Sequence, residues 1–449
     1  MSQLILHHYD LSPFGEKIRL ALGYKKLEWH SVDIPIWPPR PDTTPLTAGY
    51  RRAPVLQIGA DIYCDTQLIL REIERRHPTP TLYPNGAGIA TALGWWADTT
   101  LFMPAATLTT SIIGDGIPAE FIKDRIEFMK HDFSKGASAR ELPVNRQRVV
   151  AQMALLADML RDGRPFLVGQ SLSAADLAAY HVLWFVKKNG GPDAEAQLPF
   201  APLAAWMDRV GAIGHGKRSP MTPGDALAIA QKAQPDAARR GDAARDPSGI
   251  QAGAAVVVRA DDANDPISGT YVWGDETEIV IRHEHPRVGT VHVHFPRFGY
   301  SVVPAGSPAA LSTQDYNKQL TRDYFKAFLS KDQAWWTKHI APTFKRHDPG
   351  LPFEVVGPGG VKQLAEALLP GIPDMKLPIE EVIADGEFVL VRLRVKGTHG
   401  GPLMGMDATG KTIDIGVLDL FQIRDGKLIE HWALLDNLGM LKQLGVTAI

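Results

Sequence analysis

The spacing of apolar and polar residues changes along the chain and predicts four structural parts. Over residues 1–80, short apolar strands alternate with amphipathic helices, as in a small α/β unit. From residue 86 to 234, apolar residues recur at helical spacing, which predicts an all-helical part. Residues 250–304 resemble five short strands separated by turns, whereas residues 312–449 contain helices and then long strands. We therefore expect a multidomain fold: α/β, all-α, a small β-rich extension and a C-terminal α+β domain.

Two segments without apolar periodicity separate these parts. Residues Pro235–Gly249 are rich in Ala, Asp, Arg, Pro and Gly, which is typical of a linker or surface excursion. A second break falls at Pro304–Ser312. Within the helical part, Ser173 and Asp176 have the spacing of a capping box, and we interpret them as a structural helix start.

Composition indicates a soluble protein. Of 449 residues, 45% are hydrophobic and 22% are charged, with a formal net charge of −2, so bulk charge does not favour nucleic acid or an anionic membrane as partner. No apolar run is long enough to span a membrane, and the N-terminus lacks the pattern of a secretory leader, so we expect a cytoplasmic protein. The single cysteine, Cys64, excludes an internal disulfide, and we expect it to be buried and unreactive.

Three helix or strand starts in the first 80 residues could together hold a short γ-linked peptide. Ser12 precedes a proline at the start of a predicted helix, where its hydroxyl either only caps the helix or also meets a ligand. Ala53-Pro54 opens a strand, and a cis proline there would expose the preceding backbone for pairing. Asp65-Thr66 begins another helix, whose free N–H groups favour an external carboxylate.

These motifs resemble those of the cytosolic glutathione transferases over residues 1–225. The matching runs are Ser12-Pro13-Phe14-Gly15-Glu16-Lys17-Ile18-Arg19, Ala53-Pro54-Val55, Asp65-Thr66 and the Ser173–Asp176 cap. The resemblance implies a thioredoxin-like domain followed by an all-helical domain, with glutathione as co-substrate and a homodimer. It also implies that Ser12 donates a hydrogen bond to the glutathione sulfur, which lowers the thiol pKa. Many relatives carry a small polar residue where this chain has Gly15.

The resemblance also assigns the remaining contacts to glutathione. Ala53 would pair its backbone with the cysteinyl unit, and Asp65 and Thr66 would hold the γ-glutamyl end. The residues that we assign to the glutathione site are Ser12, Phe14, Ala53, Pro54, Asp65 and Thr66.

Two His-x-His pairs stand out in the β-rich extension. His283 and His285 lie on one predicted strand, and His292 and His294 lie on the next. Spacing of two places each pair on one face, where four imidazoles on one hairpin could bind a transition metal or simply form a solvated face. Since only Glu284 lies beside them as a carboxylate, we assign no metal site. The segment is similar to an extension that some bacterial transferases carry.

A carboxylate interrupts the apolar face of the penultimate strand. Asp419 shares its face with Val417 and Phe421. If Arg424-Asp425-Gly426 forms a three-residue turn, Asp419 faces His431 on the last strand. Such a pair in a pocket can hold a base near neutral pH, or it can be a buried ion pair that satisfies only itself.

Residues 312–449 resemble the SnoaL-like polyketide cyclases, which belong to the ketosteroid-isomerase superfamily. The matching runs are His347-Asp348-Pro349, Pro373-Asp374, Gly397-Thr398-His399, Thr409-Gly410-Lys411, Asp425-Gly426-Lys427, Glu430-His431-Trp432 and Gln443-Leu444-Gly445. The resemblance implies an α+β cone with an apolar interior, in which an acidic residue removes a proton next to a carbonyl without a metal or organic cofactor.

This cone departs from its relatives at the position after the His-Trp pair. Many relatives have an aspartate where this chain has Ala433. The remaining catalytic candidates are Asp419, His431 and His347, and the side chains of Trp335-Trp336 either line the pocket or fill the core.

Three functional hypotheses follow from the sequence. The first is a glutathione transferase of the Ser12 type that conjugates or isomerises a small hydrophobic electrophile, fused to a SnoaL-like pocket for a small apolar ligand. In the second, the cone performs all of the chemistry and the transferase half is a scaffold. In the third, both pockets bind ligands without turning them over.

Overall fold

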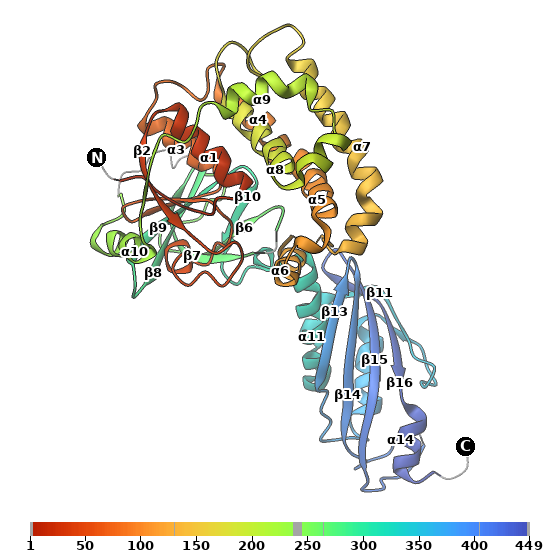
Figure 1. The fold of residues 1–449 in the computed structure, drawn as a ribbon. Coiled ribbons are helices and arrows are strands. Elements are labelled where there is room, and N and C mark those ends of the chain that lie inside the picture. The colour runs from red at the N-terminus through yellow and green to blue at the C-terminus, as the bar shows by residue number, and fades with distance from the viewer. Residues whose placement is uncertain (1–2, 130, 237–244, 264, 404, 447–449) are drawn as a thin grey trace. The chain divides into compact units, whose positions relative to one another are not determined.

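The computed structural model describes residues 3–129, 131–236, 245–263, 265–403 and 405–446. It contains two compact units, Met1–Gly306 and Ser307–Ile449 (Figure 1). Residues 237–244 of the expected linker lie outside the described residues. Among the described helices, none combines the length and the apolar character needed to cross a bilayer.

The described part of the N-terminal unit contains a ten-stranded sheet that begins with a thioredoxin-like half. Strand β1 pairs in parallel with β2 and antiparallel with β3, and β3 pairs antiparallel with β4. Helices α1 and α3 pack against each other, and α1 also contacts α8 (Ala174–Gln197) of the helical part. The elements of this half are β1 (Ile5–His8), α1 (Pro13–Tyr24), β2 (Glu28–Asp33), α2 (Thr44–Thr47), β3 (Val55–Ile58), β4 (Asp61–Cys64) and α3 (Thr66–Arg76).

The β-rich extension continues this same sheet. Strand β9 pairs in parallel with β4, so that the sheet order is β10-β6-β7-β8-β9-β4-β3-β1-β2-β5, in which β5 is Lys217–Pro220. The two halves also share one apolar core, in which Ile62 and Cys64 pack among extension residues such as Val258 and Phe295. The extension strands are β6 (Ala255–Ala260), β7 (Ile267–Gly274), β8 (Glu278–His285), β9 (Gly289–Pro296) and β10 (Tyr300–Pro304).

The helical part has the capping box that its sequence predicts. Asp176 accepts the Ser173 backbone N–H at 2.9 Å and also bonds Leu167 N at 2.7 Å and Trp206 Nε1 at 3.0 Å. Its elements are α4 (Ala87–Trp96), η1 (Ala97–Leu101), α5 (Phe102–Ile113), η2 (Gly114–Gly116), α6 (Ala119–Met129), α7 (Lys135–Met159), α8 (Ala174–Gln197), η3 (Ala201–Leu203) and α9 (Ala204–Gly211).

The chain returns to the sheet before residue 234, where we expected the helical part to end. Residues Lys217–Pro220 form β5, which pairs in parallel with β2, and α10 (Pro223–Lys232) contacts β2 and β9. The expectation of helix over residues 217–220 is therefore wrong. This strand is short, and only its pairing with β2 distinguishes it from a loop.

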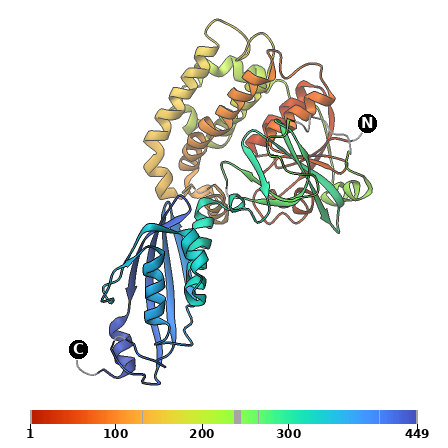
Figure 2. The same ribbon diagram turned by 180° about the vertical axis from the view of Figure 1, so that it is seen from behind.

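The C-terminal unit contains, in its described residues, a six-stranded sheet ordered β12-β11-β16-β15-β14-β13. Helices α11 and α13 cover one face of this sheet (Figure 2) and enclose an apolar core that includes Phe344 and Phe421. The elements are η5 (Pro308–Ala310), α11 (Thr313–Ser330), α12 (Gln333–His339), β11 (Ile340–His347), β12 (Val355–Val356), α13 (Gly357–Leu368), β13 (Ile379–Asp385), β14 (Phe388–Thr398), β15 (Thr412–Arg424), β16 (Lys427–Leu435) and α14 (Asn437–Leu444).

The register between β15 and β16 differs from the predicted one by two residues. Asp419 lies opposite Ala433, and His431 lies opposite Phe421. The turn has two residues instead of three, since Arg424 pairs with Lys427, and both Asp425 and Gly426 have positive φ. Because the ladder then skips Ile429, the inward and outward faces from Glu430 onward remain as the apolar pattern predicts. Nearer the turn the prediction is wrong, since the buried Leu428 takes the inward position that was expected for Ile429.

We predict that Asp176→Ala lowers the free energy of unfolding of the N-terminal unit by about 2–4 kcal/mol, because it removes a helix cap and leaves buried N–H donors without acceptors. Denaturant unfolding measures the change. The control is Asp225→Ala, which removes a capping carboxylate that bonds Thr222 Oγ1 on the exposed start of α10 and should cost about 1 kcal/mol or less. Equal losses in the two variants would contradict the structural role of Asp176.

Candidate functional site

Ser12 caps helix α1 from a buried position. Its Oγ accepts the backbone N–H of Gly15 at 2.9 Å, and the residue is 1% exposed. Among the described contacts, the hydroxyl hydrogen of Ser12 has no acceptor. Phe14 packs edge-on against Phe102, with ring centroids 4.8 Å apart, and so anchors α1 to the helical part. The capping role is thus confirmed, while one hydrogen-bonding position of the hydroxyl remains available.

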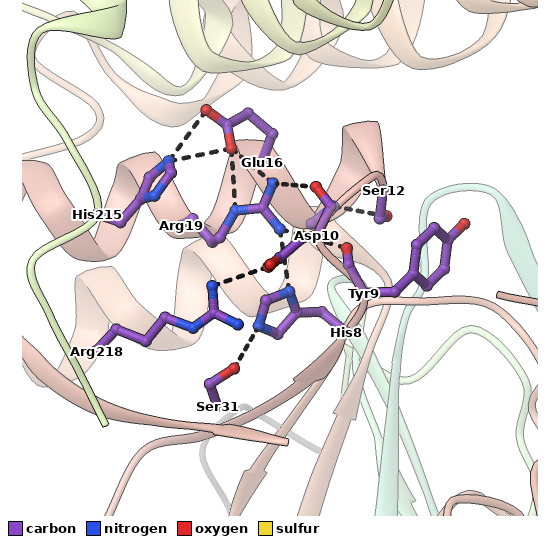
Figure 3. Close-up of polar contacts among 10 residues, drawn as sticks. His8, Tyr9, Asp10, Ser12, Glu16, Arg19, Ser31, His215 and Arg218 are labelled. Atoms are coloured by element: carbon purple, nitrogen blue, oxygen red, sulfur yellow. Dashed lines mark hydrogen bonds and ion pairs between the residues drawn. The ribbon is translucent and has the colours of Figure 1, made fainter. Parts of the chain in front are cut away.

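A buried ionic network supports the loop that carries Ser12 (Figure 3). Arg19 donates to Glu16 Oε2 at 2.7 Å and to the carbonyl oxygen of Asp10 at 3.0 Å, and Glu16 also contacts His215 at 3.1 Å. Burial alone would raise the pKa of Glu16, but the His215 hydrogen bond and the Arg19 charge lower it. Sequence reasoning missed this network. The available signal was two charged residues, Glu16 and Arg19, inside the first helix.

His8 belongs to the same network as a neutral base. Its Nδ1 lies 3.0 Å from Arg19 Nη1, and its Nε2 lies 2.9 Å from Ser31 Oγ. Because a guanidinium only donates, Nδ1 accepts and Nε2 carries the hydrogen. Burial and the charges of Arg19 and Arg218 lower the pKa of His8 to about 3.

At the second predicted subsite, Ala53 and Pro54 are joined by a cis peptide bond, as expected, just before β3. Asp65 caps α3 with a backbone φ of 70°, a conformation that non-glycine residues rarely adopt. Its Oδ1 accepts the Gln67 N–H at 2.9 Å, and its Oδ2 accepts the hydroxyl of Tyr300 at 3.1 Å. Tyr300 comes from β10 of the extension, and nothing in the local sequence indicates this contact.

The Thr66 hydroxyl is engaged on the inner side of α3. Its Oγ1 accepts from Lys17 Nζ at 3.0 Å, and Lys17 also pairs with Asp98 at 2.6 Å. Asp98 in turn bonds His181 Nε2 at 2.8 Å. The side chains of Asp65 and Thr66 therefore already have partners in the protein, and Asp65 also accepts the Gln67 N–H at the start of α3.

Cys64 is fully buried beside this subsite. Burial and the neighbouring Asp65 charge raise the pKa of the Cys64 thiol well above its ordinary value. The thiol stays protonated at neutral pH, as expected for a buried, unreactive cysteine.

The four extension histidines do not form one cluster. In the β8–β9 ladder, Arg282 pairs with His292 and His283 pairs with Val291. The pair His292/His294 therefore lies on the opposite face of the sheet from His283/His285, because side chains alternate along each strand. The hypothesis of a site made of four imidazoles is wrong for this geometric reason.

The C-terminal unit encloses a cavity of about 200 Å³. Most of its wall is apolar, but Tyr324, Arg346, Asp348 and Asp419 also line it. Asp419 is 3% exposed, and its Oδ1 has no hydrogen-bond partner among the described residues. Burying a carboxylate oxygen in an apolar wall without a hydrogen-bond donor costs free energy, so Asp419 is a candidate functional residue.

His431 lies directly behind Asp419. Its Nε2 is 3.3 Å from Asp419 Oδ2, an ion-pair distance without hydrogen-bond geometry. Its Nδ1 lies 3.2 Å from Arg346 Nη1, and Arg346 pairs with Asp348 at 2.8 Å. Burial lowers the pKa of His431. The neutral imidazole accepts from Arg346 and therefore presents its Nε2–H to Asp419.

The predicted Asp419–His431 pair thus forms, although as diagonal neighbours instead of direct cross-strand partners. Asp419 lies opposite Ala433. The neighbouring strand therefore supplies a carboxylate directly across from that position.

The other candidates in this unit lie outside the cavity. His347 stacks on Trp432 with ring centroids 5.2 Å apart and pairs with Glu430 at 2.7 Å, so it does not join Asp419. Trp336 is buried in the apolar core with Trp335 packed beside it, and neither lines the cavity. A residue that sequence reasoning missed is Tyr324, whose buried hydroxyl has no partner among the described residues. Burial raises the pKa of Tyr324 to about 12.

Comparison with known proteins agrees with the division of the chain into transferase-like domains and a SnoaL-like domain. Residues 6–81 match the family model for the glutathione S-transferase N-terminal domain, residues 136–209 match the glutathione S-transferase C-terminal domain, and residues 318–444 match the SnoaL-like polyketide cyclase model. A solved GST-like protein from Pseudomonas syringae is 37% identical, with a TM-score of 0.54. The match covers 68% of this chain and all of that one.

Curated relatives match shorter stretches. An aklanonic acid methyl ester cyclase of Streptomyces peucetius is 39% identical over 61 residues, which is 14% of this chain and 42% of the relative. The FtsZ-localized protein A of Caulobacter vibrioides is 30% identical over 80 residues, which is 17% of this chain and 35% of the relative. These matches span less than half of each of these two relatives. The chain belongs to the glutathione S-transferase-like proteins, and a SnoaL-like domain follows its transferase domains.

We predict that His8 makes the N-terminal unit less stable as the pH falls from 6.5 towards 3. In that window the unfolded chain protonates this histidine and the folded chain does not, so lowering the pH favours unfolding. The slope from one such group is at most about 1.4 kcal/mol per pH unit. Denaturant unfolding at several pH values should give a shallower slope for His8→Gln, and equal slopes in the two proteins would contradict the assignment.

Proposed function

We propose that this chain has two separate sites, one for glutathione and one for proton transfer. The N-terminal unit binds glutathione as co-substrate and holds its thiol as the thiolate for attack on a small electrophile. The C-terminal cavity binds a small apolar carbonyl compound and removes a proton from the neighbouring carbon. A cytoplasmic location, expected from the sequence, and a homodimer, implied by the resemblance to glutathione transferases, are part of this proposal.

The observation that carries the proton-transfer function is the unpartnered Oδ1 of Asp419 on the apolar cavity wall. A carboxylate oxygen without a hydrogen-bond donor has a lone pair free to accept a proton. His431 Nε2 lies 3.3 Å from the other carboxylate oxygen, on the side away from the unpartnered Oδ1. The phenol of Tyr324, neutral at physiological pH, would donate to the oxygen on which negative charge develops. No metal or organic cofactor enters this mechanism.

We predict that Asp419→Asn lowers the rate of proton abstraction by about 10²–10⁴-fold, because it keeps the shape of the side chain and removes the base. One suitable probe is a simple β-keto ester, and NMR measures the rate at which its acidic C–H exchanges in deuterated water. A second probe is aklanonic acid methyl ester, which the name of the Streptomyces relative suggests.

Glu430→Gln is the matched control, because this carboxylate lies on the opposite face of the sheet with His347 and should leave the exchange rate unchanged. If Asp419→Asn changes the unfolding midpoint but not the exchange rate, the role of Asp419 is purely structural.

The glutathione function is favoured by the hydrogen-bonding state of Ser12. Its oxygen already accepts from Gly15, so the hydroxyl hydrogen is left to donate, next to the positive end of the α1 dipole. A hydrogen bond to the thiolate and this dipole both lower the pKa of a bound thiol. Since Ser12 is 1% exposed, contact with the sulfur requires that the side chains covering it move apart.

We predict that Ser12→Ala lowers the rate of glutathione conjugation to chlorodinitrobenzene by at least about tenfold and raises the pKa of the bound thiol, read from thiolate absorbance against pH. Ser134→Ala is the control, because Ser134 caps α7 through the same kind of bond and reports the cost of losing a cap alone. Unchanged conjugation in Ser12→Ala would refute the role of Ser12. Retained binding of glutathione without conjugation by either protein would support the binding-only hypothesis.

A further inference from the structure

The junction between β4 and β9 places two histidines and one aspartate together. Asp61 begins β4 and lies opposite His292 in the parallel ladder, and His294 follows two residues later on the same face. One potential ligand atom from each of these residues lies within 4.8 Å of the other two. We propose that Asp61, His292 and His294 bind a divalent transition-metal ion of the Zn²⁺ or Co²⁺ type.

The ligand set fits such an ion. Imidazole nitrogen and carboxylate oxygen suit Zn²⁺ and Co²⁺ better than Ca²⁺ or Mg²⁺, which prefer oxygen ligands. Three protein ligands leave a fourth tetrahedral position for water. Ligand atoms around one Zn²⁺ lie roughly 3.3–3.5 Å apart, as its bond lengths of about 2.0–2.1 Å require. Small side-chain rotations therefore bring the three groups from their present positions to binding distance.

A further carboxylate orients one of the proposed ligands. Glu278 Oε1 lies 2.6 Å from His294 Nδ1, which directs His294 Nε2 towards Asp61 Oδ1 at 3.0 Å. The ring of Tyr63 stacks on His294 with centroids 4.5 Å apart and limits its rotation. A histidine that holds a carboxylate on one nitrogen and faces the site with the other has the usual arrangement of a metal ligand and its supporting partner.

His292 and Asp61 also have atoms that could bind the metal ion. His292 Nδ1 is buried and has no hydrogen-bond partner among the described residues. Asp61 accepts the Asp236 backbone N–H through Oδ2 at 2.9 Å, so a metal bound at Oδ1 would replace only the bond to His294. The site is distinct from the two proposed above. The bound metal would link β9 of the extension to β4, because its ligands come from both strands. Its ligand on β4, Asp61, lies four residues before Asp65.

Metal titration of the full chain tests the proposal. After removal of metal with a chelator, Co²⁺ is added while visible absorption and heat of binding are followed, and Zn²⁺ is then used to displace it. We expect one equivalent of Co²⁺ to bind with ligand-field bands and Zn²⁺ to raise the unfolding temperature. His292→Asn should weaken binding at least about tenfold and abolish the thermal shift.

The matched control is the double variant His283→Asn/His285→Asn, which removes the other pair from the opposite face of the same hairpin and should bind like wild type. Asp61→Asn provides a second test from the other strand, and far-UV circular dichroism reports whether each variant folds. Absence of stoichiometric binding by wild type would overturn the proposal and leave a metal-free Asp61–His294–Glu278 ion cluster. Equal binding by His292→Asn, or loss of binding only in the control, would overturn it as well.

Discussion

A polar group that leaves water on folding must find a partner inside the protein, and this constraint organises both units. The guanidinium of Arg19 is buried because Glu16, His8 and two backbone carbonyls surround it. Each of these contacts replaces a hydrogen bond to water, whose loss without replacement would cost several kcal/mol. Asp419 Oδ1, Tyr324 Oη and His292 Nδ1 are among the described buried polar atoms that lack such a partner. Asp419 and Tyr324 also line a cavity, where a ligand could supply the missing hydrogen bonds.

In the N-terminal unit, the pairing of β9 with β4 brings distant segments of the chain into one structure. It gives the transferase strands and the extension a common core, and it places Asp61 beside His292. The same sheet carries Tyr300 to within 3.1 Å of Asp65. The extension thus supplies a residue at the predicted glutathione subsite, so any account of ligand binding there must include both parts of the chain.

In the C-terminal unit, the cavity depends on which face of each strand points inward. The two-residue turn at Asp425-Gly426 alone would have reversed the alternation of β16 relative to β15, and the skipped residue Ile429 restores it. Asp419 and His431 consequently share the inner face, with Ala433 opposite the carboxylate. Although position 433 carries an alanine, Asp419 therefore gives the cavity wall an acidic side chain.

Local patterns determined much of this protein. The order of α/β, helical, β-rich and α+β segments, the caps at Ser12, Asp65 and Ser173, and the inward face shared by Asp419 and His431 all follow from spacing and capping preferences that act within a few residues. Tertiary structure alone decided the register of the last hairpin, the separation of the two histidine pairs and the contacts of Asp65 with Tyr300 and of Asp61 with His294. Those features depend on which strands become neighbours and on the residue at which pairing starts. Such long-range choices arise from packing of the whole core, so no single stretch of the sequence encodes them.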